Sequence, residues 1–85
     1  MITILKTDGS RIECPNQDLN LAWMQEKVGG NIEIVEAPDQ ELIVNEDAEE
    51  LPINPSASYW FAKYGRSPGI IRGDAILVTL PDRVD

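Results

Sequence analysis

The sequence contains no histidine and only one cysteine, Cys14. Because histidine is the usual general base, the Ser-His-Asp and Cys-His arrangements of nucleophilic catalysis are excluded. A single thiol without imidazole leaves too few nitrogen and sulfur ligands for an ordinary zinc site, and no disulfide can form within the chain. These absences exclude most small hydrolases and zinc proteins, and they favour a reducing, cytoplasmic setting.

Phosphate-binding loops are also absent. No GxxxxGK[ST] motif occurs, and Gly29-Gly30 precedes a predicted strand, whereas a dinucleotide-binding loop precedes a helix. Carboxylates are plentiful, but a chain of 85 residues offers little depth in which burial could raise the pKa of one of them for acid catalysis. We therefore expect a protein that is not an enzyme, with no cofactor and no metal site.

Basic residues are scarce, with 7 Lys and Arg against 15 Asp and Glu and a net charge of −8. This charge opposes direct binding to nucleic acid or to anionic lipid. The apolar stretches are far shorter than the ~20 residues of a membrane-spanning helix, and the N-terminus lacks the pattern of a secretory signal. We expect a soluble protein whose partner is basic or is met through an uncharged surface.

Local patterns in the first third of the chain predict a hairpin and then a helix. Residues 1–5 and 11–14 read as strands, and Thr7-Asp8-Gly9 between them suits a tight turn. From about Asp18, a candidate N-cap, apolar residues recur at three- and four-residue steps, as on one side of a helix. Gly29-Gly30 is expected to end this helix, because glycine enters the left-handed conformation without penalty.

A second hairpin is predicted from residues 31–36 and 41–44. Proline in the connecting residues 37–40 favours a type I turn. We expect the first helix to pack on apolar residues that alternate along these two strands, namely Ile32, Ile34, Leu42 and Val44.

Asn54 and Pro55 predict the start of a second helix, since asparagine caps free amides and proline suits the first helical position. This helix is expected to reach about Tyr64, with Gly65 after it. Residues 75–80 form the last predicted strand, which is apolar on both sides and is therefore expected at the centre of the sheet.

The order ββαββαβ predicts a single α+β domain over residues 1–80, followed by a flexible tail over residues 81–85. Two helices pack on a mostly antiparallel sheet in this fold. We expect both helices to cover the same face.

Residues 46–50 are mostly acidic, within a stretch from Val28 to Ala62 that contains no lysine or arginine. A solvated loop is one interpretation. A calcium loop is another, but the segment lacks the turn glycine and the distant bidentate glutamate of such loops. A third is mimicry of nucleic acid, which requires a regular row of charge, whereas Glu33 and Glu36 lie three apart in a strand and point to opposite faces.

The segments VGGNIEIVEA, LIVNEDAEELPINPSA and IIRGDAILV resemble a family of small domains, the domain of unknown function numbered 3846. The resemblance covers residues 19–80 and implies no catalytic residue. It implies a gene carried by phages, plasmids or bacterial genomes, and hence a protein that modifies a host component. The shared positions are Gly29, Gly30, Asn45, Glu46, Asn54, Gly73 and Asp74.

Two interpretations of these positions stay open. In the structural one, the asparagines close loops and the glycines Gly29, Gly30 and Gly73 meet conformational needs. In the functional one, polar residues converge at one end of the sheet beside an aromatic anchor and bind a partner. The candidate partner-binding residues are Asn45, Glu46, Asn54, Tyr59, Trp60 and Asp74, and Tyr59 is the aromatic residue expected to be exposed.

We therefore predict an acidic, non-enzymatic binding protein, encoded by a phage, that modulates a host protein by stoichiometric contact in the host cytoplasm. One alternative is a DNA mimic that inhibits a restriction or transcription protein. Another is an oligomeric sponge for a small nucleotide signal. A homo-oligomer formed through a free sheet face or edge also stays open.

Overall fold

The structure is a computed structural model and describes residues 1–64 and 70–79. Seven elements follow one another in the predicted order, and the predicted α+β class is confirmed. They are β1 (Ile2–Leu5), β2 (Arg11–Glu13), α1 (Leu21–Val28), β3 (Ile32–Ala37), β4 (Gln40–Asn45), α2 (Pro55–Lys63) and β5 (Ala75–Thr79). Gly65, Leu80 and the predicted tail over residues 81–85 lie outside the described residues.

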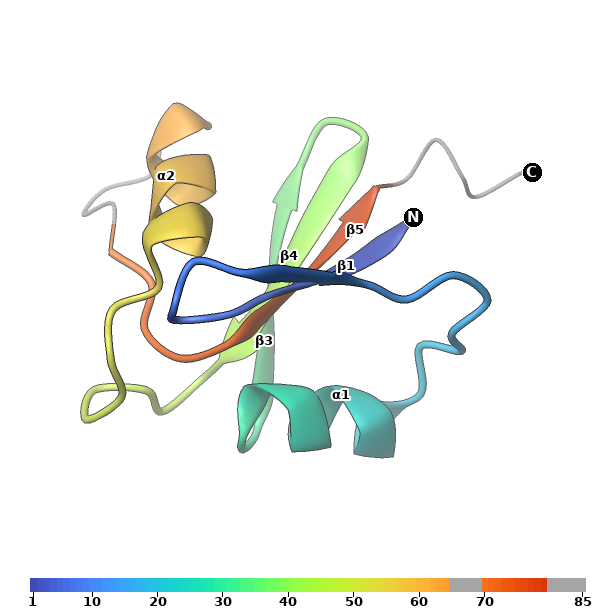
Figure 1. Cartoon of the computed structure of the whole chain (residues 1–85), viewed down its shortest axis with the longest axis horizontal. Helices are drawn as coiled ribbons and strands as arrows, with labels where there is room; N and C mark the ends of the chain where they lie inside the picture. Colours follow the sequence, from blue (N-terminus) through green and yellow to red (C-terminus); the bar gives the residue numbers. More distant parts are fainter. Residues whose placement is uncertain (65–69, 80–85) are drawn as a thin grey trace.

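The five strands form one sheet in the order β2-β1-β5-β4-β3, and every neighbouring pair is antiparallel. β5 lies in the middle, as its apolar character on both sides predicts (Figure 1). The last strand therefore bonds to one strand of each hairpin and joins the two hairpins into a single sheet.

The two helices lie on opposite faces of the sheet, so the prediction that both cover one face is wrong (Figure 1). α2 packs with Trp60 on the face that carries Leu42 and Val44. α1 packs with Val28 on the face that carries Ile43. Since successive side chains of a strand point to opposite faces, the buried run Leu42–Val44 serves both helices.

The residues that pack against α1 also differ from the predicted set. Ile32 packs against the α1 cluster, whereas Leu42 and Val44 belong to the α2 cluster. Ile34 lies 49% exposed although it pairs with the buried Ile43 on β4. α1 has only eight residues, and it leaves this part of its sheet face uncovered.

Both helices have side-chain caps. Asn54 caps α2 and is followed by proline, as predicted. The cap of α1 is Asn20 and not Asp18, and its Oδ1 accepts a hydrogen bond of 2.9 Å from the Trp23 N–H. Gly29 ends α1 with a φ of 85°, the left-handed conformation that the glycine pair predicts.

The first hairpin has a turn stabilised by Asp8. Its carboxylate accepts hydrogen bonds from the Ser10 hydroxyl at 2.6 Å and from the Ser10 N–H at 2.8 Å. These bonds favour the charged form and lower the pKa of Asp8, the hydroxyl bond contributing most.

The turn of the second hairpin differs from the predicted type I. Only Pro38 and Asp39 separate the paired residues Ala37 and Gln40, and Asp39 has a φ of 61°. A positive φ at the second central position is the mark of a type II turn. This conformation is costly for residues with a Cβ, although aspartate tolerates it better than most.

Asp39→Gly is therefore expected to raise the free energy of unfolding by about 0.5–1 kcal/mol, because glycine adopts the positive φ without the clash of a Cβ. Urea unfolding followed by circular dichroism measures this change. Asp18→Gly removes the same charge at an exposed position whose φ is not positive, and it serves as the control. Equal effects of the two substitutions would contradict the explanation by strain.

Candidate functional site

Asn54, one of the predicted site residues, is fully buried and joins three segments: the end of β1, the residues before β5 and the start of α2. Its Nδ2 donates hydrogen bonds to the Leu5 carbonyl at 2.8 Å and to the Gly73 carbonyl at 2.9 Å. Its Oδ1 accepts from the Ala57 N–H at 3.0 Å, and its own N–H donates to the Ile71 carbonyl at 2.8 Å. Both Nδ2 hydrogens are used and the side chain is buried, so Asn54 is not accessible to a ligand.

Asn45 joins the end of β4 to the end of α1. Its Nδ2 donates to the Val28 carbonyl at 3.0 Å, and its Oδ1 accepts from the Asp47 N–H at 2.7 Å. The side chain lies against Gly30, where an added Cβ would be 3.1 Å from Nδ2. Asn45 and Gly30 therefore act as a pair: the absence of a side chain at Gly30 lets the amide reach the helix end.

Asp74 connects the first hairpin to the start of β5. Its Oδ1 accepts from the Thr7 N–H at 3.0 Å, and its Oδ2 lies 3.0 Å from the Lys6 ammonium nitrogen. Gly73 before it has a φ of 83°, and an added Cβ there would lie 2.7 Å from Leu51 Cδ1. The Gly-Asp pair thus sets both the bend into β5 and the position of the hairpin turn.

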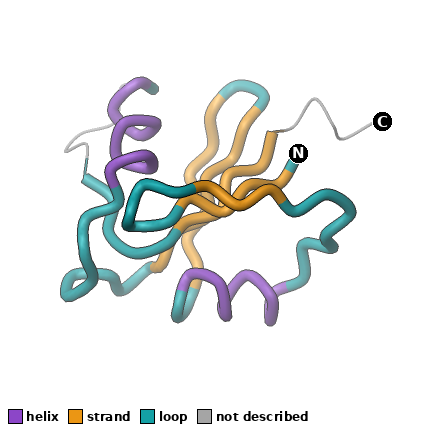
Figure 2. The backbone as a smooth tube through the Cα atoms, in the orientation of Figure 1, coloured by secondary structure: helices purple, strands orange, loops and turns teal. Residues whose placement is uncertain are grey.

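Asn45, Asn54 and Asp74 do lie at one end of the sheet, as predicted, where the loops before α2 and before β5 gather (Figure 2). Their side chains, however, are engaged with backbone groups and with Lys6. In the described part of the chain, every buried side-chain nitrogen and oxygen has a hydrogen-bond partner. These contacts favour the structural interpretation of the three residues.

The two aromatic candidates have different surroundings. Trp60 is 7% exposed, packs in the α2 cluster and donates its Nε1–H to the Gln40 Oε1. Its ring centroid lies 4.8 Å from that of Tyr64. Tyr59 is 74% exposed, as predicted. Of the two, Tyr59 is the one that presents its ring to solvent.

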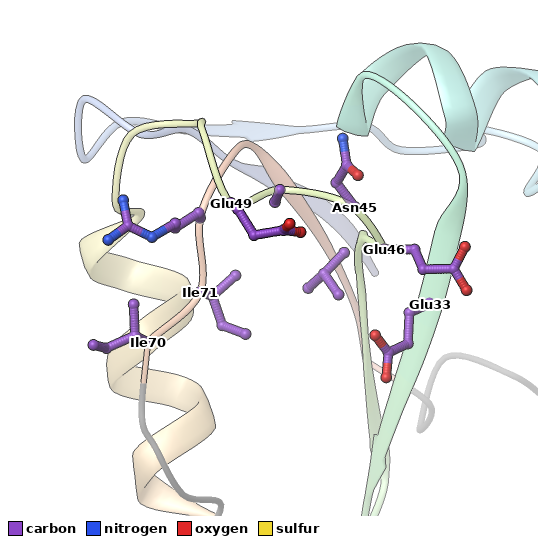
Figure 3. A pocket seen from close by; sticks show the side chains of 9 residues that line it. Glu33, Asn45, Glu46, Glu49, Ile70 and Ile71 are labelled. Carbon is purple, nitrogen blue, oxygen red and sulfur yellow. The ribbon is translucent and has the colours of Figure 1, made fainter.

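Glu46 lines a groove of about 300 Å³ on the α2 face of the sheet. One wall comes from β3 and β4, the second from the acidic segment and the third from the residues before β5 (Figure 3). Ile71 in the third wall is held against α2, since its N–H donates to the Ser58 hydroxyl at 2.7 Å. The lining residues are Glu33, Val44, Asn45, Glu46, Ala48, Glu49, Ile70, Ile71 and Arg72.

We call this cavity the acidic groove. Glu33 and Glu49 point toward its middle from opposite sides, whereas the Glu46 carboxylate points outward (Figure 3). Ile70 is 53% exposed and forms apolar lining beside them. Arg72, the basic residue of the lining, donates to the Leu51 carbonyl at 3.1 Å. The groove therefore combines apolar surface with carboxylates, which suits a cation carried on an apolar stem.

A second groove, of about 190 Å³, contains Tyr59. It lies between α2 and the β1–β2 hairpin, and Arg11 and Lys63 line it together with Tyr59 and Tyr64. Glu46 does not line this groove, so the predicted combination of Glu46 with an aromatic anchor is divided between two grooves.

From the sequence, Glu33 and the acidic segment 46–50 were weighed separately, and it was not predicted that Glu33, Glu49 and Ile70 line one groove. The stretch from Val28 to Ala62 without basic residues was visible in the sequence. The three side chains, however, come from separate parts of it and beyond it: β3, the acidic segment and the residues before β5. No short sequence motif predicts that these three residues lie together.

Within residues 1–64 and 70–79, no three acidic or cysteine side chains are grouped so that they could hold a metal ion. The same residues contain no helix with the length and apolarity needed to cross a membrane.

The family model described as "Domain of unknown function (DUF3846)" matches residues 2–85. The chain belongs to this family. The match extends the resemblance on both sides, since the first hairpin is included and the motifs pointed only to residues 19–80. No curated protein and no solved structure matches the chain. Membership in DUF3846 assigns no biochemical role to the chain. The residues of the acidic groove are therefore the basis for the function proposed below.

Proposed function

We propose that this DUF3846 domain is a non-enzymatic binding protein that contacts a basic partner protein in one-to-one stoichiometry through the acidic groove. A lysine or arginine side chain of the partner would lay its apolar stem along Val44 and Ile70. Its charged head would sit between Glu33 and Glu49. The observation that carries this proposal is the convergence of those two carboxylates over apolar lining.

Charge over the wider surface supports the same partner class. The stretch from Val28 to Ala62 forms most of the groove and contains no lysine or arginine, so its field has one sign. Such a field raises the rate of encounter with a basic protein, while desolvation of the ion pair in the groove would slow dissociation. The expectation that the partner is a host protein in the cytoplasm rests on the mobile-element context that the family resemblance implies, and it stays a prediction.

Capture from host lysate tests the proposal. A tagged wild-type chain is expected to retain a basic protein at low salt and to keep part of it at high salt, because the apolar contact is not screened. The charge-reversed variant Glu33→Lys/Glu49→Lys is expected to lose that protein. Glu33 and Glu49 are both exposed, so the melting temperature should change little.

The matched control is Asp18→Lys/Glu26→Lys, which makes the same change in net charge at exposed residues outside the acidic groove. Quantitative mass spectrometry of the captured protein compares the three chains. Equal loss from both variants would show that net charge alone governs binding, and it would contradict a groove-specific contact. Complete loss at high salt would instead favour the DNA mimic, whose binding is almost wholly electrostatic.

A second candidate function, the nucleotide-binding sponge, is favoured by the Tyr59 groove. Arg11 and Lys63 could bind a phosphate there, and the exposed Tyr59 ring could stack on a base. Mass spectrometry of the gently purified chain tests this candidate. A nucleotide that is retained by the wild type and lost from Tyr59→Ala would support it, whereas purification without any nucleotide would count against it.

A further inference from the structure

The sheet has two edge strands, and they differ in length. β2 has three residues and β3 has six. Edge strands of natural proteins are usually short, covered or interrupted, because an unpaired edge invites another strand to pair. Within the described residues, β3 has a strand on one side only. Among the described residues, its outer edge is the longer of the two sheet edges that have no neighbouring strand.

The register identifies the backbone groups on that edge. The Glu46 N–H donates to the Asn31 carbonyl at 2.8 Å, so the pair Asn31–Glu46 is hydrogen-bonded. Bonded and non-bonded pairs alternate along an antiparallel ladder. Glu33 and Val35 therefore direct their backbone groups toward β4, while Ile32 and Ile34 direct theirs outward.

The side chains along β3 give this edge two chemically different sides. Ile32 and Ile34 lie on the α1 face, and Ile34 is 49% exposed. Glu33 lies on the α2 face, where it forms part of the acidic groove. A strand added beside β3 would place alternate side chains next to Ile34 and next to Glu33.

We propose that the outer edge of β3 binds an extended segment of the partner protein in which apolar and basic residues alternate, so that the segment becomes a sixth strand of the sheet. The inference rests on the proposed function and specifies its binding mode. Apolar residues of the segment pair with Ile32 and Ile34 through backbone hydrogen bonds. Basic residues lie opposite Glu33 on the other face and extend toward the acidic groove.

Charge complementarity favours this occupant over a second copy of the chain. Pairing two β3 strands in one continuous sheet would bring the Glu33 carboxylates of both copies to the same face beside the acidic groove, where like charges repel one another. A basic segment would place opposite charges there. The same carboxylates therefore oppose self-association and favour a basic strand.

The test uses a short peptide that alternates valine with lysine and isotope-labelled full-length chain. On binding, amide hydrogen exchange of Ile32 and Ile34 is expected to slow by roughly tenfold or more, because both N–H groups gain acceptors. Exchange at Glu33 and Val35 should change less, since those amides are already bonded to β4. A shift to a dimer without the peptide would assign the edge to a second copy and overturn the proposal.

N-methylated peptides give a matched control. Methyl groups on the valine amides remove the donors that face β3, and the dissociation constant is expected to rise at least roughly tenfold. Methyl groups on the lysine amides face away and should leave binding nearly unchanged. Equal binding of the two methylated peptides, or binding without protection of Ile32 and Ile34, would overturn the edge proposal. The proposed function would be unaffected by that result if the chain still captured a basic protein through Glu33 and Glu49. Failure of the edge proposal is therefore distinguishable from failure of the groove proposal.

Discussion

Replacing Asn54 with alanine is expected to lower the free energy of unfolding by about 3–5 kcal/mol. Loss of the helix cap contributes about 1 kcal/mol. Each of the two buried carbonyls that lose their donor, those of Leu5 and Gly73, contributes about 1–2 kcal/mol more. A domain of this size is stable by about 5–10 kcal/mol, so the variant would lose about a third of its stability or more.

Thermal unfolding followed by circular dichroism measures this effect, with Asn20→Ala as the control. Asn20 caps α1 by one hydrogen bond and is exposed, so its loss should cost only about 1 kcal/mol. Asn54→Asp keeps the acceptor for Ala57 but turns an oxygen toward the two carbonyls, so it should be at least as harmful as alanine at neutral pH. Equal costs for Asn20→Ala and Asn54→Ala would show that the bonds to Leu5 and Gly73 add nothing.

Trp60→Ala is expected to cost about 3–5 kcal/mol, because truncating a large buried aromatic residue leaves a cavity under α2. Trp60→Phe should cost less, since the ring still fills most of the space and only the hydrogen bond to Gln40 is lost. Urea unfolding measures both variants. The amount of partner captured by Trp60→Ala should decrease only in proportion to the fraction of the chain that is unfolded.

Tyr59→Ala is the control for Trp60, because the neighbouring ring is 74% exposed and its removal should change stability by less than about 0.5 kcal/mol. A Trp60→Ala chain that unfolds like the wild type but no longer captures the partner would contradict the assignment of Trp60 to the core.

The α+β class, the order of the elements and the central place of β5 were predictable from local patterns. Asn54-Pro55 marked the start of α2, and Gly29 marked the end of α1. The position of the helices was predicted wrongly, although the necessary signal was present. Both β4 and β5 are apolar along consecutive residues, which is typical of strands covered on both faces.

The second roles of the asparagines depend on tertiary contacts and could not be predicted. The sequence indicates that Asn54 caps a helix, but its bonds to Leu5 and Gly73 join residues 49 and 19 positions apart. The acidic groove likewise depends on tertiary contacts, since Glu33 and Glu49 line one groove only after β3, β4 and the following segment have folded. Charge composition predicted the sign of the surface, and the fold determines which carboxylates converge.

Titration of the purified, captured partner into the chain tests the central claim most directly. Calorimetry should give a one-to-one complex with the wild type and with Asp18→Lys/Glu26→Lys. For Glu33→Lys/Glu49→Lys, which has the same net charge as that control, the dissociation constant should rise by roughly tenfold or more. A groove variant that binds the partner as tightly as the control would contradict a contact centred on Glu33 and Glu49.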